Sequence, residues 1–245
     1  MSKKVVLVTG AAGGIGQSIC ERMVADGYSV AATDINAAGL VELEAKFAGS
    51  LKAYPADQTN FAEITKVVNT VESELGPIFG LVNVIGWTNA TRFETETAEY
   101  WDKVIAINFT SLLYVTQPVL KGMIERKAGR MVFVASDAGK VGTGTEAVYA
   151  GTKGAVIAFA KSIARENARY ALNINCIAPG PTETPLFAEE MAHNPQIIER
   201  MLKAIPFRRA AKPADQAGVV SFLLSDDASY MTGQTLSVSG GLTMI

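Results

Sequence analysis

The 245-residue chain has little histidine, little cysteine and no excess of either charge. His193 is its one histidine, Cys20 and Cys176 are its two cysteines, and 22 basic against 24 acidic residues give a formal net charge of −2. Neither the histidine nor the cysteines have metal-site spacing, and the charge balance excludes the basic stripe typical of nucleic-acid-binding proteins. We therefore expect neither a metal nor a nucleic-acid partner.

The chain also lacks a recognisable export or membrane-anchoring segment at its start. The apolar run in MSKKVVLVTG ends at Thr9, which is too short for a signal-peptide core or a membrane span. Cys20 and Cys176 lie in apolar segments without paired spacing, which predicts buried free thiols suited to a reducing compartment. We expect a cytoplasmic protein with no membrane partner.

What the sequence does contain is a regular alternation of short β-branched segments and longer helical patterns. Parallel strands need crossover helices whose apolar sides pack on the sheet. The pattern predicts one α/β domain over residues 1–245, a Rossmann-type doubly wound fold with about seven parallel strands and helices on both faces. The predicted strands are 4–8, 29–34, 51–57, 79–86, 130–136, 172–180 and 235–241, and the predicted helices include 15–27, 37–49, 60–76, 98–126 and 146–168.

The alternation stops after Gly180, where a proline-containing segment precedes the next helical pattern, ADQAGVVSFLLSDDAS. This segment follows the sixth predicted strand, at the sheet edge where open α/β folds bind their ligands. We therefore predict a substrate lid over about residues 183–212.

A glycine-rich turn, TGAAGGIG, follows the first predicted strand and opens a helix. Glycine at Gly10, Gly14 and Gly16 removes the side chains that would keep a pyrophosphate from the amides of the helix start. A purely structural turn is the alternative. The preceding strand, the following helix and the carboxylate of Asp34 at the end of the second strand favour a dinucleotide site.

Asp34 favours NAD over NADP. Its carboxylate can accept hydrogen bonds from both hydroxyls of the adenosine ribose, whereas a 2′-phosphate at that place would meet a like charge. Gly13, before Gly14, offers no basic side chain to receive such a phosphate. The alternative is that Asp34 merely caps the helix that follows.

The heptapeptide VYAGTKG places Tyr149 and Lys153 four positions apart, which puts them on one face of a helix. A free tyrosine, with a pKa near ~10, is a poor base at neutral pH. An ammonium about 5 Å away, at an effective dielectric constant of roughly 20, favours the phenolate by about 3 kcal/mol. The pair is therefore a candidate general acid and base, with two unrelated surface residues as the alternative.

Together these motifs resemble the classical short-chain dehydrogenase/reductase family over essentially the whole chain. The resemblance implies a homotetramer and an NAD-dependent enzyme that interconverts secondary alcohols and ketones by hydride transfer. It rests on TGAAGGIG (9–16), Asp34, Asp57, LVNVIG (81–86), Asn108, Ser136, Tyr149, Lys153 and APGPTETP (178–185).

The resemblance implies four catalytic residues. Tyr149 would exchange a proton with the substrate oxygen, and Lys153 would lower the pKa of Tyr149 while holding the nicotinamide ribose. Ser136 would hydrogen-bond the same substrate oxygen. Asn108 would anchor a water that links Lys153 to solvent.

The resemblance also implies the cofactor contacts. Asp57 with Gln58 would meet the adenine, and Asn83 with Gly86 would line the adenosine ribose. The family usually reads Asn-Asn-Ala-Gly where this chain has Val84 and Ile85 between those two residues, which puts cofactor affinity in doubt. The other implied contacts are Gly10, Gly14, Ile15, Gly16, Asp34, Ile35, Tyr149, Lys153, Pro179, Gly180, Thr182 and Thr184.

A narrower resemblance, in ASDAGKVGTGTEAVYAGTKG, APGPTETPL and LSVSGGLTM, is to the NAD-dependent 2-hydroxycyclohexanecarboxyl-CoA dehydrogenases. It implies that Trp87, Asp137, Glu146 and the segment 186–207, with Ser136 and Tyr149, surround the substrate alcohol. A core aromatic is the alternative for Trp87. Other secondary alcohols, 3-oxoacyl thioesters and a non-catalytic dinucleotide-binding regulator remain alternatives. Arg92, Arg208, Arg209 and Lys212 are interpreted either as a CoA phosphate site or as solvated surface charge.

Overall fold

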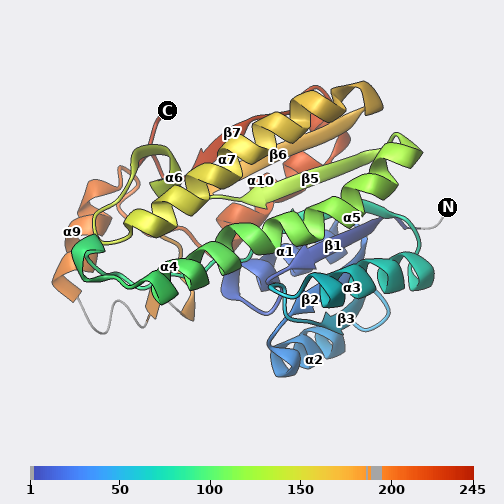
Figure 1. The fold of residues 1–245 in the computed structure, drawn as a ribbon, viewed down its shortest axis with the longest axis horizontal. Helices are drawn as coiled ribbons and strands as arrows, with labels where there is room; N and C mark the ends of the chain where they lie inside the picture. Colours follow the sequence, from blue (N-terminus) through green and yellow to red (C-terminus); the bar gives the residue numbers. More distant parts are fainter. Residues whose placement is uncertain (1–2, 186, 189–194) are drawn as a thin grey trace.

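The computed structural model describes residues 3–185, 187–188 and 195–245. A seven-stranded parallel sheet runs through the chain in the order β3-β2-β1-β4-β5-β6-β7 (Figure 1), which confirms the predicted Rossmann-type fold. The strand order reverses direction beside β1, so the loops after β1 and β4 flank the crevice where such sheets bind ligands. The strands are β1 (Val5–Thr9), β2 (Ser29–Asp34), β3 (Leu51–Pro55), β4 (Ile78–Asn83), β5 (Gly129–Val134), β6 (Leu172–Pro179) and β7 (Thr235–Val238).

Two layers of helices cover the sheet because its strands are apolar on both sides. In β1, Val5 and Leu7 belong to one buried cluster, and Val6 and Val8 belong to the other. The first cluster packs under α3 (Phe61–Glu74), α5 (Ser111–Arg126) and α7 (Ala147–Asn167), which lie in front of the sheet in Figure 1. The second packs under α1 (Gly14–Ala25), α2 (Ala37–Lys46) and α10 (Pro213–Leu224).

The stretch predicted as one helix over 98–126 is three elements. It comprises α4 (Ala98–Ile105), the π-helical turn η2 (Ala106–Thr110) and α5. The whole stretch is long and apolar enough to cross a membrane by length and composition alone, yet Leu112, Val115 and Val119 are fully buried in the sheet-facing cluster. The inner side of this stretch is therefore part of the core, and its outer side is left uncovered by the sheet.

Several short helices complete the pattern. Two of them, η1 (Phe93–Thr95) and α6 (Ala138–Val141), lie outside the predicted helices. The others are η3 (Ala168–Tyr170), which extends the predicted helix 146–168, α9 (Pro195–Ala204), in the proline-containing segment, and η4 (Asp226–Ala228), inside the predicted helical pattern ADQAGVVSFLLSDDAS. The segment predicted as a lid is closed at its base by a parallel bridge between Thr182 and Ala211. Part of that segment, including His193, lies outside the described residues.

Candidate active site

The glycine turn after β1 has the geometry of an anion site. Gly10 has a left-handed φ of +65°, and a Cβ on Gly16 would lie 2.0 Å from the carbonyl oxygen of Gly10. Gly13 caps α1 without any side-chain hydrogen bond, and the first turn of α1 contains no acidic residue. The uncapped amides and the positive end of the helix therefore fit the diphosphate of a dinucleotide.

Asp34 is fixed beside this turn. Its Oδ2 accepts a hydrogen bond from the backbone N–H of Ala12 at 3.0 Å, and its Oδ1 accepts one from Asn36 at 2.9 Å. The carboxylate is half-buried at the end of β2, while the neighbouring Ile35 is 72% exposed. The arrangement leaves lone pairs on a fixed carboxylate next to the glycine turn, as a ribose ligand requires.

The residues predicted to meet the adenine lie at the end of β3, the strand next to β2. The Asp57 carboxylate accepts hydrogen bonds from the backbone N–H and the hydroxyl of Thr59, at 2.8 and 2.7 Å. Gln58 is buried and donates to the Thr33 hydroxyl at 3.0 Å, and its Oε1 has no partner among the described residues. Asp57 thus shapes its own turn, whereas Gln58 keeps an unused acceptor.

The departure from the family pattern after β4 is accommodated by packing. The Thr9 hydroxyl donates to buried Asn83 at 2.7 Å, so a polar link between β1 and β4 is present. Val84 packs against the second core cluster, and Ile85 lies against Gly10, whose Cβ would be 3.3 Å from the Ile85 Cγ1. The Ile85 side chain therefore packs on the glycine turn that precedes α1, and Val84 adds to the core.

Tyr149 and Lys153 come together as their spacing predicts. The Lys153 Nζ lies 5.7 Å from the centre of the Tyr149 ring. Lys153 is 2% exposed, and its ammonium donates to the carbonyl oxygens of Ile85 and Val134 at 3.1 and 3.0 Å. Burial lowers the pKa of Lys153 to about 8 from its ordinary 10.5. The lysine is therefore a buried, oriented cation at the ends of β4 and β5.

This burial predicts a pH-dependent stability. Below pH 8 Lys153 is protonated both folded and unfolded, so the cost of burying its charge is present in full. Between pH 8 and 10.5 the folded state loses the proton first, and the free energy of unfolding should rise with pH by up to about 3 kcal/mol. Lys153→Met should lack this rise. Urea unfolding at pH 7, 8, 9 and 10 gives the free energy of unfolding at each pH. Parallel plots of that free energy against pH for wild type and variant would contradict the assignment.

Ser136 and Asn108 come from two further elements, the segment after β5 and the π-helical turn η2. The Ser136 Oγ, directly after β5, accepts a hydrogen bond from the backbone N–H of Ala138 at 3.1 Å. Asn108 lies in the π-helical turn and is 1% exposed. Its amide accepts from Trp87 N–H at 3.0 Å and donates to the carbonyls of Trp87 and Val104 at 2.7 and 2.9 Å. These bonds fix the loop after β4; the water-anchoring role remains a prediction.

Gly86 is held close to both groups. A Cβ on Gly86 would lie 3.1 Å from the Lys153 Nζ and 3.3 Å from the Asn108 Oδ1. The loop after β4 therefore approaches the lysine closely, and a methyl group at Gly86 would require the ammonium or the loop to move by a few tenths of an ångström.

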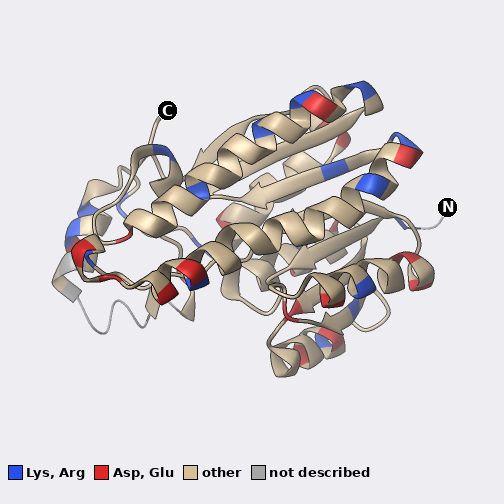
Figure 2. Cartoon of the chain, in the orientation of Figure 1, with Lys and Arg blue, Asp and Glu red and all other residues tan. Residues whose placement is uncertain are grey.

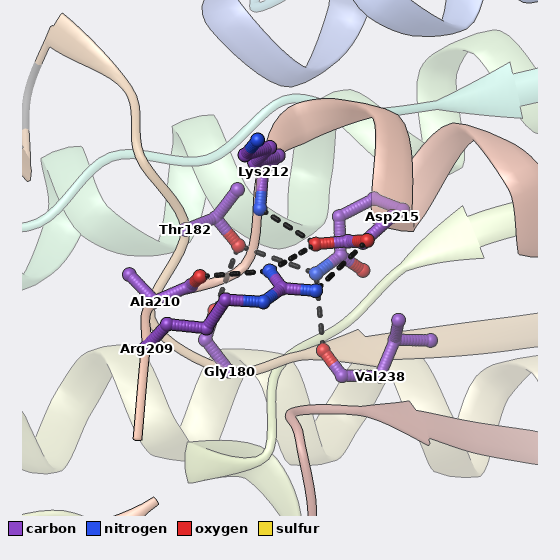
Figure 3. Close-up of polar contacts among 8 residues, drawn as sticks. Gly180, Thr182, Arg209, Ala210, Lys212, Asp215 and Val238 are labelled. Carbon is purple, nitrogen blue, oxygen red and sulfur yellow. Dashed lines mark hydrogen bonds and ion pairs between the residues drawn. The ribbon is translucent and has the colours of Figure 1, made fainter. Parts of the chain in front are cut away.

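The predicted nicotinamide wall follows β6. A Cβ on Gly180 would lie 2.6 Å from the Cβ of Ser239, so this backbone packs directly on the segment after β7. The Thr182 hydroxyl donates to the Gly180 carbonyl at 2.9 Å (Figure 3). Thr184 lies on Gly14, since a Cβ there would be 3.1 Å from the Thr184 methyl carbon. The start of the insertion thus covers the glycine turn.

The predicted substrate residues have different surroundings. Trp87 lies beside Tyr100, with ring centres 5.8 Å apart, and the Lys103 Nζ is 4.0 Å above its ring. Glu146 is half-buried immediately before α7. Asp137 is 5% exposed and accepts a hydrogen bond from Ser237 on β7 at 2.7 Å. That contact commits one Asp137 oxygen to the protein, and the other has no hydrogen-bond partner among the described residues.

The four cations considered for CoA phosphates do not form a free cluster. Arg209 is paired with Asp215 at 2.6 Å, Arg92 with Glu94 at 3.2 Å, and Arg208 donates to the Lys203 carbonyl. Arg92 and Arg209 are therefore better interpreted as paired surface charges, and Arg208 as bound to a backbone carbonyl. The backbone N–H of Lys212 donates to the same Asp215 carboxylate.

The two cysteines are part of the core, and Cys176 interacts electrostatically with Lys153. Cys20 and Cys176 are buried free thiols, as predicted, and burial raises the pKa of both. Within residues 3–185, 187–188 and 195–245 no group of three or more His, Cys, Asp or Glu side chains could hold a metal ion.

Comparison with known proteins agrees with this geometry. A family model described as enoyl-(acyl carrier protein) reductase matches residues 10–243. Acetoacetyl-CoA reductase from Acinetobacter sp. is 36% identical over 99% of this chain and 98% of its own length. The 3-oxoacyl-[acyl-carrier-protein] reductase MabA of Mycobacterium tuberculosis is 37% identical over 98% of this chain and 92% of its own.

A solved structure of a variant actinorhodin polyketide ketoreductase with NADPH superposes with a TM-score of 0.94 and 31% identity, covering 99% of both chains. The narrower resemblance to 2-hydroxycyclohexanecarboxyl-CoA dehydrogenases is not shown by these comparisons. With the glycine turn, the buried lysine and the tyrosine brought to one edge of the sheet, this chain belongs to the classical short-chain dehydrogenase/reductase family of oxidoreductases.

Proposed function

We propose that the protein interconverts a ketone and a secondary alcohol on an acyl thioester, with NAD as its cofactor. The observation that carries the proposal is the buried Lys153 ammonium 5.7 Å from the Tyr149 ring, beside an uncapped glycine turn. The thioester class is supported by the names of two relatives, an acetoacetyl-CoA reductase and a 3-oxoacyl-[acyl-carrier-protein] reductase.

The chain's own residues supply proton transfer and orientation. A bound nicotinamide would supply or accept the hydride. In the reducing direction Tyr149 gives its phenolic proton to the substrate oxygen, and the Lys153 ammonium stabilises the phenolate that remains. Ser136 donates a hydrogen bond to the same oxygen as negative charge develops on it. The two carbonyls that hold Lys153 keep its charge beside the phenol.

The cofactor choice gives a prediction at Asp34. Wild-type protein should have a higher kcat/KM with NADH than with NADPH, because the fixed carboxylate repels a 2′-phosphate. Asp34→Asn should move the NADPH/NADH ratio of kcat/KM at least tenfold toward NADPH. Steady-state rates with both cofactors measure this ratio. Asp227→Asn, the same substitution at an exposed aspartate, is the control. A wild-type preference for NADPH, the cofactor bound to the polyketide ketoreductase, would overturn the assignment.

The substrate is tested with a panel of carbonyls and alcohols. Acetoacetyl-CoA and longer 3-oxoacyl thioesters represent the class of the relatives, and 2-hydroxycyclohexanecarboxyl-CoA represents the narrower resemblance in the sequence. Simple secondary alcohols represent the remaining enzyme alternative. Change in NADH absorbance ranks them by kcat/KM, and NADH binding without turnover of any of them would favour a non-catalytic regulator.

We also propose a cytoplasmic homotetramer. The stretch Ala98–Arg126 is apolar, yet only 39% of its most apolar window is buried within a single chain. No charged residue occurs between Lys103 and Lys121, so the outer side of this helix is nearly uncharged (Figure 2). A second copy packed there would bury that surface. Light scattering at micromolar concentration that shows only monomer would contradict the tetramer.

A further inference from the structure

One buried polar side chain in α10 has no place in the chemistry described so far. Gln216 is fully buried on a helix whose other buried residues are mostly apolar, among them Ala217 and Val220. Its Oε1 has no hydrogen-bond partner among the described residues. A buried amide with an unused acceptor destabilises a fold compared with an apolar side chain of the same shape. Stability therefore does not explain glutamine at this position.

The other end of the amide closes a ring of hydrogen bonds around the predicted nicotinamide wall. Gln216 Nε2 donates to the Thr182 hydroxyl oxygen at 3.2 Å and to the Val238 carbonyl at 3.0 Å. The Thr182 hydroxyl donates a hydrogen bond to the Gly180 carbonyl. The Gly180 N–H donates one to the Val238 carbonyl at 3.2 Å. One amide thus joins α10, β7 and the loop after β6.

The same ring lies at the base of the insertion. Glu183 N–H donates to the Ala211 carbonyl at 2.8 Å, and Ala211 N–H donates to the Pro181 carbonyl at 2.9 Å. These bonds tie the two ends of the insertion together next to Thr182, and the Arg209–Asp215 pair closes the neighbouring side (Figure 3). The position of Thr182 therefore fixes both the Gly180 backbone and the start of the insertion.

We propose that Gln216 is a positioning residue that acts through Thr182. It holds the Pro179–Gly180 wall and the base of the insertion where a nicotinamide and a carbonyl substrate meet. This inference rests on the proposed function. The Thr182 hydroxyl uses its hydrogen in the bond to the Gly180 carbonyl, so Thr182 orients the wall and does not donate to the cofactor. This refines its predicted role as a cofactor contact.

Gln216→Met separates this role from a merely structural one. Removing the amide should leave the melting temperature unchanged or raised, because its Oε1 has no partner among the described residues and Thr182 and Val238 keep their hydrogen bonds with Gly180. The kcat should nevertheless fall at least tenfold, while the NADH dissociation constant changes less than threefold, because Asp34 and the glycine turn hold the other half of the cofactor. Thr182→Val should show the same loss, and the double variant should lose no more than either single variant. Gln234→Met, the same substitution at an exposed glutamine, is the matched control.

A readout without cofactor keeps the inference testable on its own. In cofactor-free protein, hydrogen exchange at the amides of Gly180, Glu183 and Ala211 should be at least tenfold faster in Gln216→Met than in wild type. Unchanged exchange at these amides would overturn the proposal, as would a kcat within twofold of wild type. A wild-type protein inactive on every thioester but showing the faster exchange in the variant would instead count against the proposed function alone.

Discussion

Tyr149→Phe should lower kcat by about 10²–10⁴-fold and leave NADH binding within about threefold of wild type. The substitution removes one oxygen and keeps the ring beside Lys153, so the cofactor pocket retains its shape. Without the phenol, the substrate oxygen has no proton partner next to the buried ammonium. Ser136 can still donate a hydrogen bond to that oxygen, but in the proposed mechanism it stabilises developing charge and does not transfer the proton, so it does not replace the tyrosine.

Stopped-flow measurement of a single reductive turnover, with NADH binding followed by fluorescence, separates chemistry from binding. Tyr230→Phe is the matched control, because that tyrosine is fully exposed and far along the chain from α7. Turnover in Tyr149→Phe within threefold of wild type would remove the acid/base role from Tyr149. Loss of NADH binding together with turnover would show that the hydroxyl serves the cofactor instead.

The features predicted correctly from the sequence are those that local rules determine. Unbroken apolar runs such as Val5, Val6, Leu7 and Val8 predicted strands covered on both faces, and the structure places these residues in two core clusters. The i, i+4 spacing alone was enough to bring Lys153 to the Tyr149 ring.

The features that could not be predicted depend on partners far apart in the chain. The buried carboxylate of Asp137 meets a serine 100 residues away, and Gln216 meets Thr182 across 34 residues. No local pattern in the sequence shows that this glutamine is buried and not exposed. The π-helical turn was likewise hidden, because the hydrogen bonds of Asn108 to Trp87 that accompany it require the loop after β4 to be in place first.

Gly16→Ala should destabilise the fold and weaken cofactor binding together, whereas Gly218→Ala should stabilise it. A Cβ on Gly16 would lie 2.0 Å from the Gly10 carbonyl oxygen and 2.9 Å from the Ala11 Cα. Both neighbours are backbone atoms, so the glycine turn itself must shift. We expect a loss of about 1–3 kcal/mol in the free energy of unfolding and at least a tenfold weaker affinity for NADH. On α10, a Cβ at Gly218 meets nothing within 4 Å.

Gly218→Ala should therefore add about 0.5–1 kcal/mol to the free energy of unfolding, which is the ordinary gain for replacing glycine inside a helix. Urea unfolding and NADH titration of both variants give the two free energies from one pair of experiments. The opposite signs are the discriminating result, since the two substitutions are chemically identical and differ only in what the new methyl group meets. A Gly16→Ala protein that binds NADH as wild type does would mean that the turn does not hold the diphosphate, whatever its stability.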